Sequence, residues 1–400
     1  MRTWQERETR VYMTTGRRQP VTLIKGQGLR VWDDAGKAYL DFVGGWAVNT
    51  LGHCHPAMVK AIEEQARTLF LASNQFYTTP QIELAELLVA NSCLQRVFIA
   101  NSGAEANEGA VKLARKWGKL HRKGAYEVIT ALNSFHGRTL AMVAATGNPH
   151  YQEPYEPIPA GFVNVPYDDI EAIKRVTTHR TCAVMLEPVQ GEAGVIIPAK
   201  DYLKQVRAWC DEQGLLLILD EVQTGMGRLG TMFGYQQAGV EPDVMTLGKG
   251  LGGGVPIAAF LAKESAAVLT PGDHGSTYGG NPLVCHVAKT VVQYVLAHNV
   301  LDNVNKNGDR LQQGFRKLQA EFPFIQEVRG RGLLQAVQFT HDISADVLTA
   351  ANAEGLLLNA PRPNTLRFMP PLVITAAEVD EGLAKFSAAL AKVGSAKKLL

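Results

Sequence analysis

The chain has 400 residues, of which 46% are hydrophobic and 20% charged, and its formal net charge is +2. This length allows a large core and two domains, and the small net charge indicates neither a nucleic-acid partner nor a membrane surface. The opening segment MRTWQERETR lacks the apolar run of a signal peptide, and no apolar stretch is long enough to span a membrane. We therefore expect a soluble cytoplasmic protein.

Five cysteines are scattered along the chain without a C-x-x-C pair: Cys54, Cys93, Cys182, Cys210 and Cys285. An odd number without pairing favours a reducing compartment over a disulfide framework or a zinc site. The run His53-Cys54-His55 does not predict a metal site, because neighbouring side chains on an extended segment point to opposite faces. A loop that approaches the active site is the preferred interpretation of this run.

Short strands and turns are predicted for the first fifty residues, where apolar and polar residues alternate around a turn at 34–37. The pattern then changes to helical spacing from Pro56, and a second helix is predicted from Pro80. Further on, strands alternate with helices: strands at 97–100, 127–130, 183–188, 215–219, 244–247 and 257–262, and helices at 104–123 and 201–213. This alternation predicts an α/β fold with a mostly parallel sheet that is covered on both faces.

The continuous apolar run 215–219 is typical of a central strand, and the proline-rich segment 149–161 is predicted to be a surface loop. A long helix after Pro282 leads into a second region that ends in a helix from Ala376 to about Val393. We expect a large domain at 51–285 and a small domain made of 1–50 and 286–400.

Two apolar runs end in side chains that carry chemistry. The run 215–219 ends in Asp220, and the run 244–247 ends in Gly248-Lys249-Gly250. Ligands of open α/β sheets bind at the carboxyl ends of the strands. A lysine that forms an imine and an acid that keeps a pyridine nitrogen protonated are what pyridoxal 5′-phosphate requires. Glycines beside Lys249 would let a flat ring approach the backbone. A surface lysine in a flexible loop is the simpler interpretation, and the pairing with Asp220 argues against it.

Other segments have both a plain and a functional interpretation. Asn101–Asn107 opens a helix whose free amides suit a phosphate, although Ser102 alone is an ordinary helix cap. Phe135 could stack on a ring, and Arg138 could bind a carboxylate. Four more features also allow both a plain and a functional interpretation: Glu187–Glu192, Gly275–Pro282, Arg367 in an apolar run, and Gly225–Gly230. The last of these matches the dinucleotide pattern G-x-G-x-x-G but does not follow its strand directly.

With these residues identified, the chain closely resembles the class-III aminotransferases, which are pyridoxal-phosphate enzymes of fold type I, and among them the acetylornithine aminotransferases of arginine biosynthesis. Nine segments in the family's order carry the resemblance: LDFVGGWAVNTLGHCHP, SNQFYTTPQ, NSGAEANE, SFHGRT, EPVQGEAG, DEVQTGMGR, TLGKGLGGG, STYGGNP and LRFMPPL. The resemblance implies a large domain with a mostly parallel sheet and a smaller α+β domain built from both termini.

The resemblance implies that Lys249 binds the cofactor and then moves the proton, and that Asp220 pairs with the pyridine nitrogen. Further cofactor contacts are implied for Ser102, Gly103, Ala104, Phe135, Glu221, Val222 and Gln223, with Thr277 reaching the phosphate held by a partner subunit. The resemblance thus implies a homodimer whose active sites are shared across the interface.

For the substrates, the resemblance implies that Arg138 takes the α-carboxylate of the amino donor, with Ser276 beside it. Glu192 is expected to pair with Arg367 and to release it for the second carboxylate of glutamate or 2-oxoglutarate. Trp46 stands where relatives tend to have a smaller aliphatic residue or a tyrosine, which leaves the donor open.

The implied reaction is transamination of N2-acetylornithine with 2-oxoglutarate, giving N-acetylglutamate 5-semialdehyde and glutamate. Ornithine, succinylornithine, GABA and lysine-pathway donors stay open as alternatives. A nicotinamide-dependent dehydrogenase that uses Gly225–Gly230, and a binding protein without activity, are hypotheses from other classes.

Overall fold

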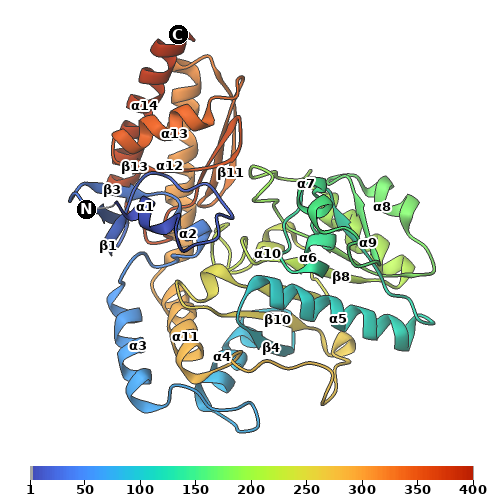
Figure 1. Ribbon diagram of the computed structural model, residues 1–400. Coiled ribbons are helices and arrows are strands. Elements are labelled where there is room, and N and C mark those ends of the chain that lie inside the picture. The colour runs from blue at the N-terminus through green and yellow to red at the C-terminus, as the bar shows by residue number, and fades with distance from the viewer. Residues whose placement is uncertain (1–2, 400) are drawn as a thin grey trace.

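A computed structural model describes residues 3–399. At its centre is a seven-stranded sheet in the order β4-β10-β9-β8-β7-β5-β6 (Figure 1). Only β10 runs against its neighbours, pairing antiparallel with β4 and β9. The mostly parallel α/β sheet predicted from the sequence is confirmed. The strand bounds are β4 Arg96–Ala100, β5 Glu127–Ala131, β6 Phe162–Val165, β7 Thr181–Leu186, β8 Leu216–Asp220, β9 Val244–Leu247 and β10 Ala258–Ala262.

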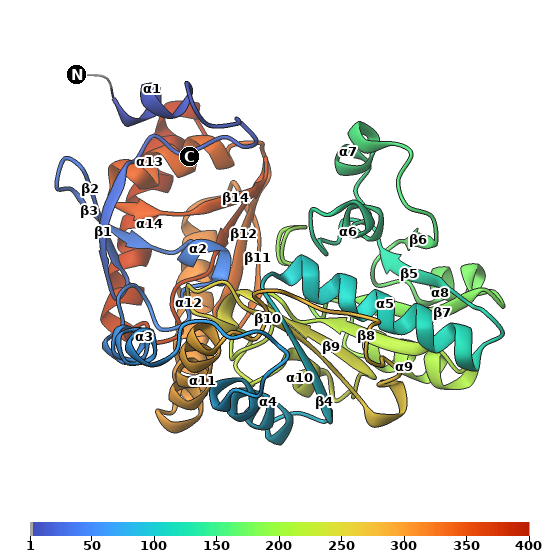
Figure 2. The same cartoon turned by 60° about the horizontal axis from the view of Figure 1, so that its bottom comes forward.

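Strand β8 is buried on both faces, as its unbroken apolar run requires. Leu216 and Ile218 pack in one hydrophobic cluster with residues of α5 (Gly103–His121). Leu217 and Leu219, which point the other way, pack in a second cluster with residues of α9 (Tyr202–Gln213). Figure 2 shows α5 running across one face of the sheet. Both layers leave the carboxyl end of β8 free to present Asp220.

Shorter helices complete the region around this sheet: α4 Thr79–Ala90, α6 Leu140–Ala145, α7 Pro149–Gln152, η1 Glu153–Tyr155, α8 Ile170–Val176, α10 Gly234–Ala238, η2 Lys249–Leu251 and η3 Glu264–Ala266. The segment 149–161 was predicted to be a loop, and the structure corrects this, because α7 and η1 lie within it. The Asn148 side chain caps α7, and Pro149 occupies its first turn. Both residues are helix-start signals that the proline-rich composition masked.

Strands from the two ends of the chain share one sheet, in the order β1-β2-β3-β13. The contact is a parallel pairing of β3 with β13. A further antiparallel sheet has the order β11-β12-β15-β14. The bounds are β1 Leu23–Gln27, β2 Arg30–Asp33, β3 Ala38–Asp41, β11 Ile325–Arg331, β12 Leu334–Phe339, β13 Leu356–Leu357, β14 Asn359–Arg362 and β15 Thr365–Phe368. This joining of both ends agrees with the proposed small domain, whose boundaries at residues 50 and 285 stay predictions.

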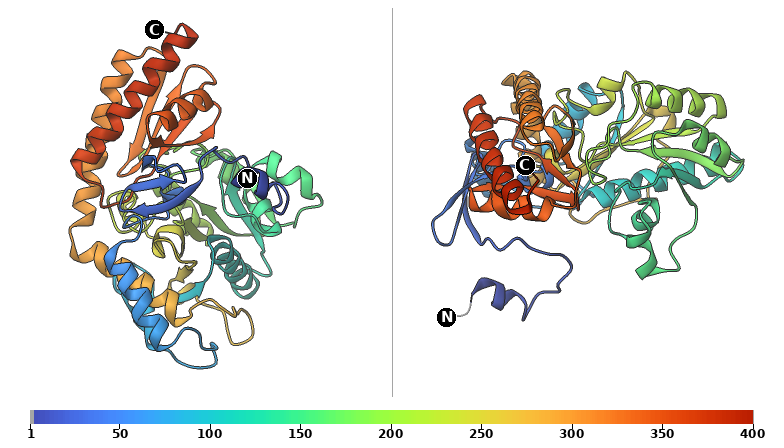
Figure 3. Two further views of the ribbon diagram at one scale, coloured as in Figure 1. Left: turned by 60° about the vertical axis from the view of Figure 1, so that its left-hand side comes forward. Right: turned by 90° about the horizontal axis from the view of Figure 1, so that it is seen from above.

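Long helices pack beside these two sheets, with α11 leading from the central sheet into them (Figure 1; Figure 3, left). The remaining bounds are α1 Trp4–Glu8, α2 Gly44–Ala47, α3 Pro56–Thr68, α11 Pro282–Ala297, α12 Val300–Glu321, α13 Ser344–Ala353 and α14 Ala376–Lys397. The last helix runs a turn beyond its predicted end at Val393. Between residues 3 and 399, every helix is too short or too polar to cross a lipid bilayer.

Candidate active site

A cavity of about 230 Å³ opens at the carboxyl ends of β8 and β9. Nine of the residues predicted from the sequence line it: Gly103, Ala104, Phe135, Arg138, Glu192, Asp220, Val222, Gln223 and Lys249. These residues lie up to 146 positions apart in the chain, and the fold brings them to one sheet edge. Four other lining residues were not assigned a role from the sequence: Asn107, His136, Gly137 and Glu187.

Asp220 is the last residue of β8, and its buried carboxylate is held from three sides. The His136 ring (Nδ1) lies 2.7 Å from Asp220 Oδ2, and Asn107 Nδ2 donates to the same oxygen at 2.8 Å. The backbone N–H of Val222 donates to Oδ1 at 3.0 Å. Burial alone would lower the pKa of His136, but the hydrogen bond and charge of Asp220 raise it. The contact therefore favours a charged imidazolium at His136 beside the Asp220 carboxylate.

Lys249 follows β9 by two residues and enters the same cavity. Its backbone φ of +42° is unusual for a residue with a side chain, and such strain concentrates at functional sites. Its amine has no hydrogen-bond or ion-pair partner among residues 3–399. Burial lowers the pKa of Lys249, while the charge of Glu192 opposes that shift. A buried amine that is neutral more often than a surface lysine is suited to act as a nucleophile and as a base.

The N-terminus of α5 supplies free backbone donors to the cavity wall. Gly103 and Ala104 are its first two residues, and N–H groups of a first turn have no acceptor within the helix. A side chain at Gly103 would place its Cβ only 2.8 Å from Val222 Cγ1, so the packing requires glycine there. Ser102 does not line the cavity, and its hydroxyl caps the helix by accepting from Glu105 N at 3.3 Å. The helix dipole and its open amides favour an anion such as a phosphate.

Glu192 and Arg367 form the ion pair that the family resemblance implies, with Nη1 to Oε1 at 2.8 Å. Arg367 comes from β15 and is wholly buried. Its guanidinium also donates to Asn359 Oδ1 at 2.9 and 3.1 Å and to Gln223 Oε1 at 3.1 Å. Burial raises the pKa of Glu192, but the charges of Arg367 and Lys249 and the hydrogen bonds from Arg367 and Gln223 together lower it to about 2. The Glu192 carboxylate is thus ionised at neutral pH.

Glu187 is a buried carboxylate of the cavity wall that sequence reasoning placed in a motif but gave no role. Its Oε2 accepts from Phe135 N at 3.2 Å. Burial raises the pKa of Glu187 to about 8, with Asp220 adding to the effect and His136 opposing it. Asn107 and His136 also lacked an assignment, although both sit inside motifs already singled out.

Phe135 and Arg138 lie next to each other at the cavity. The Arg138 guanidinium is 5.3 Å from the centre of the Phe135 ring and 3.9 Å from that of Tyr151. Arg138 is exposed, and the two rings hold it by cation–π contacts. An arginine held in this way still offers its N–H groups to an incoming carboxylate.

Glu221 does not reach the cavity, although it was predicted to contact the cofactor. Its carboxylate is buried on the other side of the turn, where it accepts from Gly234 N, from Tyr235 N at 2.7 Å and from Thr224 Oγ1 at 3.2 Å. Burial raises the pKa of Glu221 to about 7. The Glu221 side chain therefore caps α10. It points away from the cavity because successive side chains of an extended chain alternate in direction, and Asp220 faces the cavity.

Three further predicted residues lie apart from the cavity within a single chain. Ser276 accepts from Asn101 Nδ2 at 3.1 Å and from Gly279 N at 2.9 Å. Thr277 is exposed beside it, and both face a different hollow. Trp46 is 57% exposed, with a backbone φ of +62°. None of these three side chains lines the cavity that holds Lys249.

The glycine pattern Gly225–Gly230 occupies turns, and the next helix begins only at Gly234. A dinucleotide fingerprint needs a helix that opens at the last glycine. Added side-chain atoms at Gly230 would lie 2.0 Å from Asn305 Oδ1, so this glycine serves packing. The dehydrogenase hypothesis is wrong for this segment.

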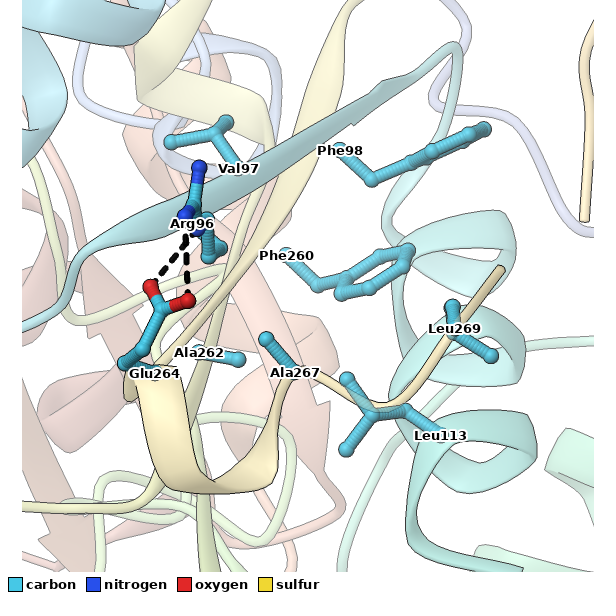
Figure 4. A pocket seen from close by; sticks show the side chains of 9 residues that line it. All are labelled: Arg96, Val97, Phe98, Leu113, Phe260, Ala262, Glu264, Ala267 and Leu269. Carbon is cyan, nitrogen blue, oxygen red and sulfur yellow. Dashed lines mark hydrogen bonds and ion pairs between the residues drawn. The ribbon is translucent and has the colours of Figure 1, made fainter. Parts of the chain in front are cut away.

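A second hollow of about 420 Å³ lies outside the site, between β4, β10 and α5. Figure 4 shows its mostly apolar lining, with the rings of Phe98 and Phe260 side by side and an Arg96–Glu264 ion pair. The ion pair is exposed, with Nε to Oε2 at 2.7 Å. Without a nucleophile or a buried titratable group, this hollow offers no catalytic chemistry.

The residues of the first cavity fit pyridoxal phosphate on structural grounds. A carboxylate held by three donors, an unpartnered buried amine and the open amides of a helix N-terminus border one space. Each matches one part of that molecule: the pyridine nitrogen, the aldehyde and the phosphate. Fold and site together define a pyridoxal-phosphate enzyme of fold type I.

The chain belongs to the class-III aminotransferase family. The family "Aminotransferase class-III" matches residues 12–390. The acetylornithine aminotransferase of Caldanaerobacter subterraneus subsp. tengcongensis is 50% identical, with 94% of this chain and 96% of that protein covered. The acetylornithine aminotransferase of Thermosynechococcus vestitus is 49% identical, with 96% of each covered. Enzymes of this class depend on pyridoxal phosphate, so the predicted aminotransferase class and cofactor are confirmed.

Solved structures of the same class match over almost the whole chain. An ornithine aminotransferase from Toxoplasma gondii has a TM-score of 0.95 at 33% identity, covering 99% of this chain and 97% of that one. The N-acetylornithine aminotransferase from Stenotrophomonas maltophilia has a TM-score of 0.83 at 39% identity, covering 95% and 98%. Of these two structures, the ornithine aminotransferase is thus more similar to this chain in backbone, and the N-acetylornithine aminotransferase is more similar in sequence.

Proposed function

We propose that this protein transfers the terminal amine of N2-acetylornithine to 2-oxoglutarate, giving N-acetylglutamate 5-semialdehyde and glutamate, as a cytoplasmic enzyme of arginine biosynthesis. The observation that carries the proposal is the arrangement of two arginines: Arg138 lines the cavity and is exposed, whereas the wholly buried Arg367 is paired with Glu192, which lines the cavity. The names and identities of the curated relatives support the same donor.

Lys249 and Asp220 divide the chemical work in this proposal. The bound cofactor supplies an electron-withdrawing ring that stabilises the charge left when the carbon beside the amine loses a proton. Lys249, as a buried amine with a lowered pKa, takes that proton and returns it at the other carbon. Asp220, held by His136, would keep a proton on the ring nitrogen of the bound cofactor. Gly103 and Ala104 would bind the phosphate of the cofactor through their amides, and Phe135 would pack against its ring.

Arg138 and Arg367 sort the substrates by their number of carboxylates. A donor that reacts at its distal amine places its single nearby carboxylate on Arg138 and leaves Arg367 paired with Glu192. Glutamate and 2-oxoglutarate carry two carboxylates and need both arginines. Displacing Glu192 from Arg367 exchanges one carboxylate partner for another, so one cavity serves both halves of the reaction.

We further propose a homodimer whose sites are completed across the interface. Large apolar side chains gather on the exposed segment 69–77 and at Tyr278: Leu69, Phe70, Leu71, Phe76 and Tyr77. So much exposed apolar surface is typical of an interaction site. Thr277 lies in the same region and faces away from its own chain's cavity. In this proposal it binds the phosphate held by the partner subunit.

The N-terminal segment supports the same arrangement. Figure 3 (right) shows α1 and the residues after it standing away from the rest of the chain. Val11 and Met13, which follow α1, are 86% and 84% exposed.

Equilibrium sedimentation tests the homodimer: we expect twice the chain mass of 43.5 kDa, and a monomer with full activity would contradict the shared site.

A donor panel tests the substrate. Purified enzyme is supplied with 2-oxoglutarate and with equal concentrations of acetylornithine, succinylornithine, ornithine, GABA or a diamine. We expect the highest kcat/KM for acetylornithine. Turnover of ornithine without turnover of acetylornithine would keep the aminotransferase class and overturn the donor. Trp46, exposed on a strained backbone in one chain, is the residue we would exchange next in that case.

A further inference from the structure

The loop that carries Glu192, residues 191–195, has an unusual backbone. It is closed by a bridge between Gln190 and Ile196, and the amides of Gly194 and Val195 both donate to Gly191 O at 3.2 Å. Val195 is completely buried with φ +60°, and a β-branched residue rarely adopts this conformation. Such a conformation persists only where the surroundings over-determine it.

Two arginines from the C-terminal sheet supply that constraint. Arg329 of β11 donates from Nε to Gly194 O at 2.9 Å, and Arg362 of β14 donates from Nε to Ala193 O at 3.4 Å. Both reach from one sheet to a loop that follows β7 of another sheet. A Cβ at Gly194 would lie 3.3 Å from Arg329 Nη2, so the loop and the guanidinium are in close contact.

Each arginine is itself fixed by other side chains. Arg329 Nη1 donates at 2.7 Å to both Glu327 Oε2 and Gln338 Oε1. Arg362 Nη2 donates to Asn133 Oδ1 at 3.2 Å. A guanidinium held at several N–H groups loses little freedom when it makes one more bond. Both arginines therefore make hydrogen bonds to other side chains as well as to the loop. Their loop contacts are to two consecutive carbonyls, those of Ala193 and Gly194.

We propose that Arg329 and Arg362 are positioning residues that latch the 191–195 loop to the C-terminal sheet and thereby keep Glu192 paired with Arg367. The inference rests on the proposed function of that pair in sorting one-carboxylate donors from dicarboxylates. By holding the loop's backbone, the latch makes the closed pair the resting state. It therefore favours the donor that leaves Arg367 covered and adds a cost for 2-oxoglutarate, which must displace Glu192.

The variants Arg329→Gln and Arg362→Gln remove the charge and shorten the reach to the loop. Arg310→Gln is the matched control, because Arg310 pairs with Asp380 on an exposed surface between α12 and α14. Arg329→Lys is the conservative variant, since a lysine can still donate one hydrogen bond to Gly194 O. Thermal unfolding of each variant establishes that it folds.

Amide hydrogen exchange of the intact protein measures the loop directly. We expect exchange at residues 194–196 to become about 2- to 10-fold faster in the two glutamine variants, the range that the loss of one hydrogen bond gives. We expect no change in Arg310→Gln and an intermediate effect in Arg329→Lys. Unchanged exchange in both glutamine variants would overturn the latch, even if the enzyme prefers a different donor.

Steady-state kinetics separates the latch from simple structural support. We expect the KM for 2-oxoglutarate to fall and the KM for acetylornithine to rise, each by about 2- to 10-fold, with kcat changed less than either. A parallel rise of both KM values, or a loss of kcat alone, would contradict the proposal. If the wild-type enzyme does not use acetylornithine, the proposed donor fails, and the exchange measurement still decides the latch.

Discussion

The two ends of the catalytic cavity are built in different ways, although each holds an acid beside a cationic side chain. At one end Asp220 terminates a central strand and receives three hydrogen bonds from its surroundings. At the other end Glu192 sits on a five-residue loop and meets an arginine from another sheet. The carboxylate of Asp220 is almost fully buried, whereas the Glu192 side chain is 31% exposed.

This difference matches what each end has to do. A group that sets the charge of a cofactor must not move during the reaction, and a buried carboxylate that accepts three hydrogen bonds resists movement. A group that admits two kinds of substrate has to exchange partners, and a loop with one principal ion pair can do so. The molecule thus combines a fixed electrostatic end with an exchangeable recognition end.

The largest effect is expected from Lys249→Ala, which removes the group between the two ends. Turnover should fall by about four orders of magnitude or more, as for other residues that act directly on the reacting atoms. The near-visible absorbance of the cofactor bound at this lysine should also disappear. Lys119→Ala, at an exposed position on α5, is the control. Retained turnover in Lys249→Ala would contradict the role of the lysine.

Asp220→Asn tests the fixed end. The amide keeps the shape but loses the charge beside His136, so it cannot hold a proton on the facing nitrogen. We expect kcat/KM to fall by about 10²–10³-fold for the donor and for 2-oxoglutarate alike. Half-reactions followed by stopped-flow absorbance measure the two separately. An effect on only one half-reaction would show that Asp220 belongs to substrate recognition.

Glu192→Gln tests the exchangeable end, where the effect should be one-sided. Loss of the charged partner uncovers Arg367, so we expect the KM for acetylornithine to rise by about 10-fold, the scale of a charge-assisted hydrogen bond. The KM for 2-oxoglutarate should stay level or fall. Steady-state kinetics with each substrate varied in turn checks this. Equal losses for both substrates would remove the distinction between the two ends.

The smallest effect concerns Glu187, which borders the fixed end. Burial raises the pKa of Glu187 from 4.5 to about 8 in the folded protein. The unfolded chain therefore releases this proton at lower pH than the folded chain, and stability falls as pH rises from about 4.5 to 8. The Glu187→Gln variant has no titrating carboxyl at this position, so its stability should not show this fall between pH 4.5 and 8.

We expect the Tm of the wild type to drop relative to Glu187→Gln by about 1–3 °C between pH 5.5 and pH 8. Thermal unfolding of both proteins across that range measures the difference, and the offset at pH 5.5 is the internal reference. A constant difference at all pH values would mean that Glu187 is ionised throughout.

The sequence predicted the parts of the site that depend on local pattern. Asp220 and the Gly248-Lys249 pair each come at the end of a short buried run, which marks the carboxyl end of a strand. The N-terminus of α5 followed from the capping serine and the glycine beside it. The sheet's helical cover was likewise readable from alternating segments, since each face of β8 needs its own apolar layer.

The parts that the sequence did not predict depend on contacts between distant segments. His136 and Asn107 bind Asp220 across 84 and 113 residues, and no local pattern connects them. Asn359 reached Arg367 only through the register of β14 and β15. The antiparallel direction of β10 was also hidden, because an apolar run of five residues has the same appearance in either direction. Glu221 was misassigned because its neighbour Asp220 does face the cavity.

A spectral cycle tests whether Lys249 carries the cofactor through both half-reactions. Wild-type protein with bound pyridoxal phosphate is mixed first with acetylornithine alone and then with 2-oxoglutarate, while its near-visible absorbance is recorded. We expect the band to decrease on addition of the donor, to return on addition of the acceptor, and to be absent from Lys249→Ala. A protein whose spectrum does not respond to either substrate, or a Lys249→Ala variant that completes the cycle, would contradict it.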